Sequence, residues 1–231
     1  LFQVPDPSRY GAVEIDSEGR ILHFVGKPEP GKAPSNLVNA GIYVLERKVL
    51  DYVPAGRPVS TEKEVFPVLA REGALYGYEG RGLWVDIGVP EDYLRANSLL
   101  LSKIGIHRGE ASNVDESAEV LPPASIGAGV EVGANSVIGP NVSFADYVNI
   151  GRGCRIENSI IFNGASIGDY TCVRNAIIGE NATLERWVKI ESGSLIGDYA
   201  VIADGVTITQ GVTVCPSKRV EESILEPQQV L

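Results

Sequence analysis

The stretch ASIGAGVEVGANSVIGPNVSFADYVNIG, residues 124–151, decides the fold, because an aliphatic residue or Phe returns in it every six positions. A period of six fits neither the 3.6-residue turn of a helix nor the two-residue alternation of a strand. It fits short strands joined by tight turns, three to a coil, with coils stacked at the parallel-strand spacing of about 4.8 Å. The stretch therefore predicts an all-β left-handed parallel β-helix of hexapeptide repeats.

The same rhythm continues to Val220, which places the β-helix at residues 118–220. Its aliphatic or Phe positions are Val120, Ile126, Val132, Ile138, Phe144, Ile150, Ile156, Phe162, Ile167, Val173, Ile178, Leu184, Ile190, Ile196, Ile202, Ile208, Val214 and Val220. Two one-residue slips, between Phe162 and Ile167 and between Val173 and Ile178, are interpreted as shortened corners. At eighteen residues to a coil, the repeats predict about six coils.

The first hundred residues have a different pattern. Strand-like runs occur at 11–15, 21–26, 37–45, 74–79 and 83–87, and helical patterns at 46–53, 60–72 and 90–104. Alternating strands and helices predict an α/β sheet, here part of a Rossmann-like domain. We therefore expect an α/β domain over 1–104, a polar linker over 105–117, the β-helix over 118–220 and a C-terminal tail over 221–231.

Composition excludes several classes of partner. The net charge is −10 and no run rich in Lys or Arg occurs, so neither a nucleic acid nor a membrane surface is expected as a partner. Three widely spaced cysteines, Cys154, Cys172 and Cys215, fit a reducing compartment and predict a cytoplasmic protein. The chain starts at Leu1 and contains no Met, so we expect that the N-terminal part of a longer protein is absent.

Two residues stand where strands are expected to end. Asp86 closes the apolar run LWVD, and in open α/β sheets ligands collect at the carboxyl ends of strands. It is interpreted either as a Mg²⁺ ligand or as an acceptor for the following turn, with the two readings nearly even. Lys27 precedes Pro28, and its ammonium either faces a phosphate or is an ordinary solvated surface group.

Polar residues also interrupt apolar or helical segments. Asn39 lies inside the run LVNAGIYVL, where its amide needs hydrogen-bond partners, and Gly41 permits the close approach of a ligand or another chain. Asn39 then either contacts sugar hydroxyls or satisfies a kink of the backbone. Glu62 lies in the first turn of an expected helix, where most charged residues are simply solvated.

Taken in order, the motifs GKP (26–28), NAGIY (39–43), STEKEVFP (60–67) and WVDIGVPEDY (84–93), followed by the repeats, resemble a known family. They resemble the sugar-phosphate nucleotidyltransferases, most closely the mannose-1-phosphate guanylyltransferases (GDP-mannose pyrophosphorylases). The resemblance implies transfer of a nucleotidyl group from a nucleoside triphosphate to a sugar-1-phosphate, with release of pyrophosphate and with Mg²⁺ as cofactor.

The resemblance also implies roles for single residues. Lys27 would bind the sugar-1-phosphate, Asn39 and Glu62 the sugar hydroxyls, and Asp86 would be one of two Mg²⁺-binding aspartates. Gly41 belongs to the same sugar-binding motif. Gly26 stands where the family has a Glu, so any sugar contact of that Glu is absent here.

The family's glycine-rich loop with a Thr-Arg pair is missing from the 231 residues, so no catalytic set is complete and the chain as given is expected to be inactive. One alternative is a non-catalytic regulatory or assembly subunit of such an enzyme. A lower-ranked alternative is a hexapeptide acyltransferase, disfavoured because His23 and His107 both precede the repeats and leave no histidine base within them. The flat faces of the β-helix favour a homo-oligomer.

Overall fold

The structure is a computed structural model that describes residues 1–25, 29 and 31–230. The chain forms two compact units, Leu1–Trp84 and Val85–Leu231. Lys27 lies outside the described residues. In the described part of the chain, no helix combines the length and the hydropathy that crossing a bilayer requires.

The first unit is a small α/β body. Its sheet has the order β1-β4-β2-β3 and is antiparallel, with strands β1 (Phe2–Gln3), β2 (Ala12–Ile15), β3 (Ile21–Val25) and β4 (Leu37–Val38). Its helical segments are η1 (Arg47–Tyr52), the π-helical turn η2 (Thr61–Val65) and α1 (Phe66–Arg71). Val65, Phe66 and Leu69 are buried and pack with Phe24 and Leu75, which fixes α1 against β3.

Three of the expected strands do not form as predicted. The run 37–45 is a strand only in β4, the run 74–79 contributes a single bridge between Tyr76 and Arg20, and no strand occurs at 83–87. The β-forming side chains of Ile42 and Val44 are 78% and 100% exposed. A strand needs a hydrogen-bonded neighbour, and within the described residues this segment has none in a sheet.

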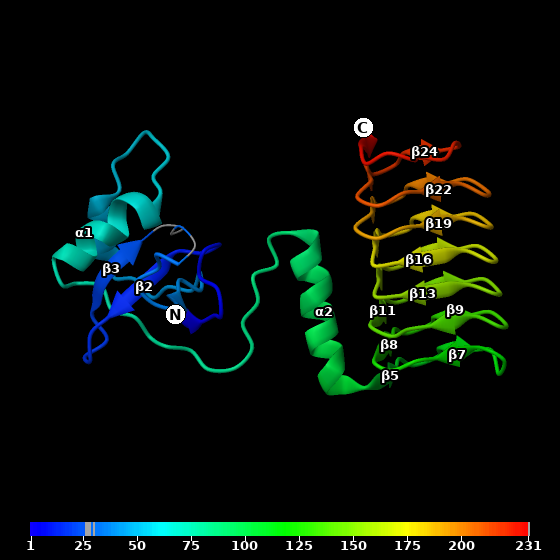
Figure 1. Ribbon diagram of the computed structural model, residues 1–231, viewed down its shortest axis with the longest axis horizontal. Coiled ribbons are helices and arrows are strands. Elements are labelled where there is room, and N and C mark those ends of the chain that lie inside the picture. Colours follow the sequence, from blue (N-terminus) through cyan, green and yellow to red (C-terminus); the bar gives the residue numbers. More distant parts are fainter. Residues whose placement is uncertain (26–28, 30, 231) are drawn as a thin grey trace. The chain divides into compact units, whose positions relative to one another are not determined.

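The second unit contains a three-faced parallel β-solenoid (Figure 1). One sheet comprises β5 (Ile106–Arg108), β8 (Ala124–Ile126), β11 (Val142–Phe144), β14 (Ile160–Ile161), β17 (Ile177–Ile178), β20 (Leu195–Ile196), β23 (Thr213–Val214) and β25 (Gln229–Val230). The second comprises β6 (Asn113–Val114), β9 (Glu131–Val132), β12 (Asn149–Ile150), β15 (Ser166–Ile167), β18 (Thr183–Leu184), β21 (Val201–Ile202) and β24 (Arg219–Val220). The third comprises β7 (Glu119–Val120), β10 (Val137–Ile138), β13 (Arg155–Glu157), β16 (Cys172–Arg174), β19 (Lys189–Ile190) and β22 (Thr207–Ile208).

The sequence rhythm therefore predicts the α/β region and the parallel β-helix correctly, but it underestimates the solenoid. Sheets of eight, seven and six strands make about seven coils, where the rhythm predicts about six. The predicted linker 105–117 contains β5 and β6, which pair with β8 and β9. The predicted tail contains β25, which pairs with β23. These segments have few aliphatic residues, yet the neighbouring coil supplies their hydrogen-bond partners.

The first shortened corner lies one strand earlier than predicted. Phe144 pairs with Ile161, so the five-residue step falls between Ile156 and Ile161, and Ile161 fills the prism. Phe162 lies outside the prism and stacks on Tyr93, with ring centroids 6.5 Å apart. The second slip, between Val173 and Ile178, is confirmed, because both residues are buried in the prism and pair in register with their neighbours.

The corner residues explain the small and acidic positions of the repeat. Asp146 Oδ1 accepts a hydrogen bond of 2.8 Å from the Ala128 backbone N–H one coil away, and Asp204 Oδ1 accepts one of 2.7 Å from the Arg186 N–H. A Cβ on Gly127 would lie 2.5 Å from the Ala145 backbone, so only glycine fits there. Several corners are thus tied to the neighbouring coil by a side-chain hydrogen bond.

Helix α2 (Pro90–Ile104) belongs to the second unit, although the sequence rhythm places it in the first domain. It contacts β8, and Figure 1 shows it running beside β5, β8 and β11. The Ser143 hydroxyl donates to Asn97 Oδ1 at 2.6 Å, and the Ser98 hydroxyl donates to Asn141 Oδ1 at 3.0 Å. These contacts along the solenoid face explain why α2 clusters with the repeats.

Candidate functional site

The polar side chains of the first unit meet directly after β4. The Asn39 side-chain amide donates to the Tyr43 hydroxyl and to Glu62 Oε1, each at 2.6 Å, and Asn39 Oδ1 accepts from the Gly41 backbone N–H at 3.1 Å. The structure therefore brings together Asn39, Gly41 and Glu62, three of the residues predicted from the sequence. Gly41 and Glu62 are exposed and Asn39 is half-buried, so a ligand can reach the cluster.

The backbone conformation at residue 41 favours a glycine. Its φ is +76°, in the left-handed region that favours glycine. A Cβ at this position would meet nothing within 4 Å in the described residues, so the space beside Gly41 is open, and the close approach of a ligand or another chain stays a prediction. The glycine permits the turn that returns its N–H to Asn39 Oδ1. Trp84 Nε1 donates to the carbonyl of Ala40 at 3.2 Å and holds the same turn.

Glu62 is positioned by the start of η2. Ser60 caps this turn, with its hydroxyl accepting from the Lys63 N–H at 3.3 Å and its own N–H donating to Glu64 Oε1 at 3.1 Å. Glu64 also pairs with Arg57 at 2.6 Å, and this hydrogen bond to the guanidinium lowers the pKa of the Glu64 carboxyl. The Glu64 carboxylate thus binds Ser60 and Arg57, whereas the Glu62 carboxylate accepts from Asn39.

Tyr43 is the member of the cluster that sequence reasoning missed as a site residue. Its ring lies on Phe66 with centroids 5.0 Å apart, and Phe66 in turn meets Phe24 at 5.8 Å. Burial, together with the nearby Glu62 carboxylate, raises the pKa of the Tyr43 hydroxyl, although the Asn39 hydrogen bond opposes this. The hydroxyl therefore stays protonated at neutral pH.

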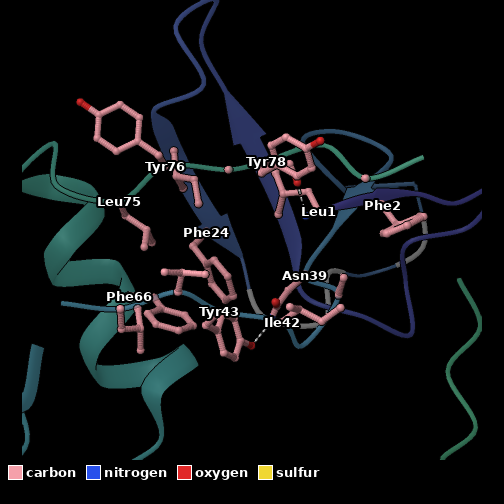
Figure 2. Close-up of a pocket in the computed structure, with 16 residues that line it drawn as sticks. Leu1, Phe2, Phe24, Asn39, Ile42, Tyr43, Phe66, Leu75, Tyr76 and Tyr78 are labelled. Atoms are coloured by element: carbon pink, nitrogen blue, oxygen red, sulfur yellow. Dashed lines mark hydrogen bonds between the residues drawn. The ribbon is translucent and has the colours of Figure 1, made fainter. Parts of the chain in front are cut away.

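A cavity of about 470 Å³ lies beside this cluster, within the first unit (Figure 2). Asn39 and Tyr43 form part of its wall, and the remainder is mainly apolar, including Phe24, Ile42 and Leu75. Glu62 is not part of the wall. The cavity thus combines an apolar lining with a polar edge, which is the usual composition of a small-molecule site.

Asp86 belongs to the second unit, in the turn before α2. Its Oδ1 accepts from the Gly88 backbone N–H at 3.0 Å, which is the turn interaction that the sequence left as one of two readings. Within the described residues, no group of three or more His, Cys, Asp or Glu side chains could hold a metal ion. A single carboxylate does not by itself make a magnesium site.

Comparisons with known proteins match both units. Residues 109–230 match the family model described as the GMPPB C-terminal domain, and residues 1–103 match the one described as nucleotidyl transferase. A mannose-1-phosphate guanyltransferase of Schizosaccharomyces pombe is 36% identical over 251 residues, and mannose-1-phosphate guanylyltransferase 1 of Arabidopsis thaliana is 31% identical over 232. Both alignments cover 100% of this chain and 63% of the relative, so the chain spans less than two thirds of their length.

Solved structures resemble the chain more weakly. A UDP-N-acetylglucosamine acyltransferase from Campylobacter jejuni is 15% identical, with a TM-score of 0.30 over 52% of this chain and 64% of that one. A likeness at this level supports no argument about function.

Proposed function

Because the chain belongs to the family of the GMPPB C-terminal domain and matches a nucleotidyl transferase model over residues 1–103, we propose that it binds a sugar-1-phosphate as the acceptor of a nucleotidyl group. The names of its relatives point to mannose-1-phosphate as the sugar phosphate and to a guanosine triphosphate as the nucleotide donor. The chain spans 63% of these relatives, so the activity of the whole protein is part of the proposal.

The observation that carries the proposal is the hydrogen-bonded cluster of Asn39, Tyr43 and Glu62. Carboxylate and amide oxygens accept hydrogen bonds from hydroxyls, and the apolar wall beside them suits the carbon face of a sugar ring. The side chains are already held by one another and by the Phe66 contact. A pre-organised site of this kind loses little conformational entropy when a ligand binds.

Two residues outside this cluster have separate proposed roles. Lys27, outside the described residues, would neutralise the phosphate with its ammonium. Asp86, in the second unit, uses Oδ1 in its turn, and its other oxygen would supply one ligand to a Mg²⁺. The metal would neutralise phosphate charge during transfer. A single carboxylate is too few to build the metal site alone.

The role proposed for this chain is to orient the sugar phosphate for transfer. In nucleotidyl transfer a sugar-phosphate oxygen attacks the α-phosphorus in line and pyrophosphate leaves, so catalysis depends on positioning and on neutralising charge. Asn39 and Glu62 would fix the sugar, and Lys27 would neutralise the phosphate. The 231 residues contain no glycine-rich loop with a Thr-Arg pair, so we propose that they bind the sugar phosphate without turnover.

Calorimetric titration of the 231-residue protein with mannose-1-phosphate tests the proposal. We expect saturable binding at least about tenfold tighter than binding of mannose or inorganic phosphate, because both halves of the ligand are held. Addition of GTP and Mg²⁺ is expected to release no pyrophosphate. Absence of saturable binding would refute the sugar-phosphate site, and steady pyrophosphate release would refute the predicted inactivity.

We also propose that the solenoid supports self-association in the cytoplasm. Tyr147, Trp187 and Tyr199 are exposed at solenoid corners, and Trp187 stacks on Tyr170 with centroids 4.3 Å apart. Exposed aromatic side chains are enriched at protein interfaces. All three cysteines are free, as suits a reducing compartment. Light scattering is expected to give a mass above the 24.7 kDa of one chain, and a monomer at micromolar concentration would contradict the proposal.

A further inference from the structure

Both N–H donors of the Asn39 side chain are already used within the protein. An asparagine amide has two N–H donors, and here one points to the Tyr43 hydroxyl and the other to Glu62 Oε1. Its oxygen accepts from the Gly41 N–H and keeps one lone pair. Glu62, as a carboxylate, can only accept. The surface that this pair offers to a ligand therefore consists of acceptors.

The Tyr43 hydroxyl maintains this arrangement. Its ring is held on Phe66, the first residue of α1, and Glu62 lies in η2, the turn that leads into the same helix. The hydroxyl oxygen is thereby fixed 2.6 Å from Asn39 Nδ2, and its own O–H hydrogen-bonds to the Glu62 carboxylate, so its proton is directed into the cluster. Without that oxygen, one amide N–H would lose its partner and could turn to donate to a ligand.

We propose that Tyr43 is a positioning residue that makes Asn39 and Glu62 an acceptor-only subsite, which selects sugars by hydroxyl groups that donate hydrogen bonds. The inference rests on the proposed function and adds a rule of specificity to it. A sugar hydroxyl donates to such a subsite, whereas a fluorine of similar size does not. The subsite thus discriminates by donor capacity in addition to shape.

The test titrates the wild-type protein and Tyr43→Phe with mannose-1-phosphate and with its monodeoxy and monodeoxyfluoro analogues. In the wild type, both replacements at the recognised hydroxyl are expected to weaken binding about tenfold or more, because the carboxylate loses its donor. In Tyr43→Phe, the parent sugar is expected to bind roughly tenfold more weakly. Replacing its hydroxyl by fluorine is then expected to weaken binding less than it does in the wild type, because the released amide N–H can donate to the fluorine.

A spectroscopic measurement separates positioning from folding. The side-chain amide signals of Asn39 in a ¹⁵N–¹H spectrum are expected to shift in Tyr43→Phe and not in Tyr52→Phe. Tyr52 is a matched control because its hydroxyl also bonds a carboxylate, Glu72 at 2.6 Å, away from the cluster. Fluoro analogues that bind the wild type as well as the parent sugar, or an unchanged Asn39 signal in Tyr43→Phe, would overturn the inference.

The variant Asn39→Ala separates the proposed sugar site from the proposed positioning role of Tyr43. If Asn39→Ala weakens binding and Tyr43→Phe does not, the sugar site stands and the positioning role of Tyr43 is wrong. If neither variant changes affinity, both the proposed function and the inference fail.

Discussion

Replacing Ile167 with aspartate is expected to unfold the middle of the solenoid. Ile167 is 1% exposed in β15 and stacks between Ile150 and Leu184 of the neighbouring coils. A carboxylate there has no cationic partner in the aliphatic prism, and an unpaired buried charge costs about 4 kcal/mol or more. Because each coil contacts only its neighbours, one disrupted coil also separates the coils below from those above.

Urea denaturation followed by circular dichroism measures this effect, and Ser166→Asp is the matched control. Ser166 is the adjacent residue of the same strand, but its side chain faces outward and is only half-buried. We expect the control to change the free energy of unfolding by less than about 1 kcal/mol. Limited proteolysis should cut Ile167→Asp near β15 and spare the control. Equal denaturation midpoints for the two variants would contradict the inward orientation of Ile167.

The solenoid could be predicted because its inward positions accept only one kind of side chain. A prism filled from three sides needs an aliphatic residue at each inward position. The sequence must therefore repeat such a residue about every six positions. The prediction failed where the period is ambiguous. Ile161 and Phe162 are adjacent and both apolar, and only the pairing of β11 with β14 decides that Ile161 points inward.

Strand boundaries in the first unit were less predictable for a related reason. The run GIYVL has strong β propensity, but a strand also needs a partner, and partners are set by tertiary contacts. Ile42 and Val44 are exposed instead. Similarly, residues 106–108 lack the hexapeptide rhythm yet form β5, because β8 offers a complete row of backbone groups to pair with.

The candidate site was predicted in part. Asn39 and Gly41 are close in sequence, and Glu62 joined them only through the resemblance to a family. Tyr43 was missed because its role depends on Phe66, a residue 23 positions away whose ring fixes the Tyr43 hydroxyl. The sequence alone does not decide whether Asp86 is a turn acceptor or a metal ligand, and the Gly88 hydrogen bond supports the turn without using the second carboxylate oxygen.

Glu62→Gln is expected to weaken binding of mannose-1-phosphate by roughly 10- to 100-fold, the range for loss of a hydrogen bond to a charged group. Glutamine has the same shape as glutamate, so the packing of η2 is kept. Its amide oxygen can still accept from Asn39 Nδ2, the contact that Glu62 Oε1 makes at 2.6 Å. Its NH₂ group must then occupy the place of Oε2, where it presents donors to sugar hydroxyls that themselves need an acceptor.

Glu46→Gln serves as the control for this variant, because Glu46 is also exposed and lies in the same unit but outside the cluster. It removes one negative charge just as Glu62→Gln does, so a general change in attraction for the phosphate affects both variants alike. Only the difference between them reports the direct contact. If both variants bind mannose-1-phosphate with the same affinity, Glu62 acts on the ligand through charge alone, and the hydrogen-bonded sugar subsite is wrong.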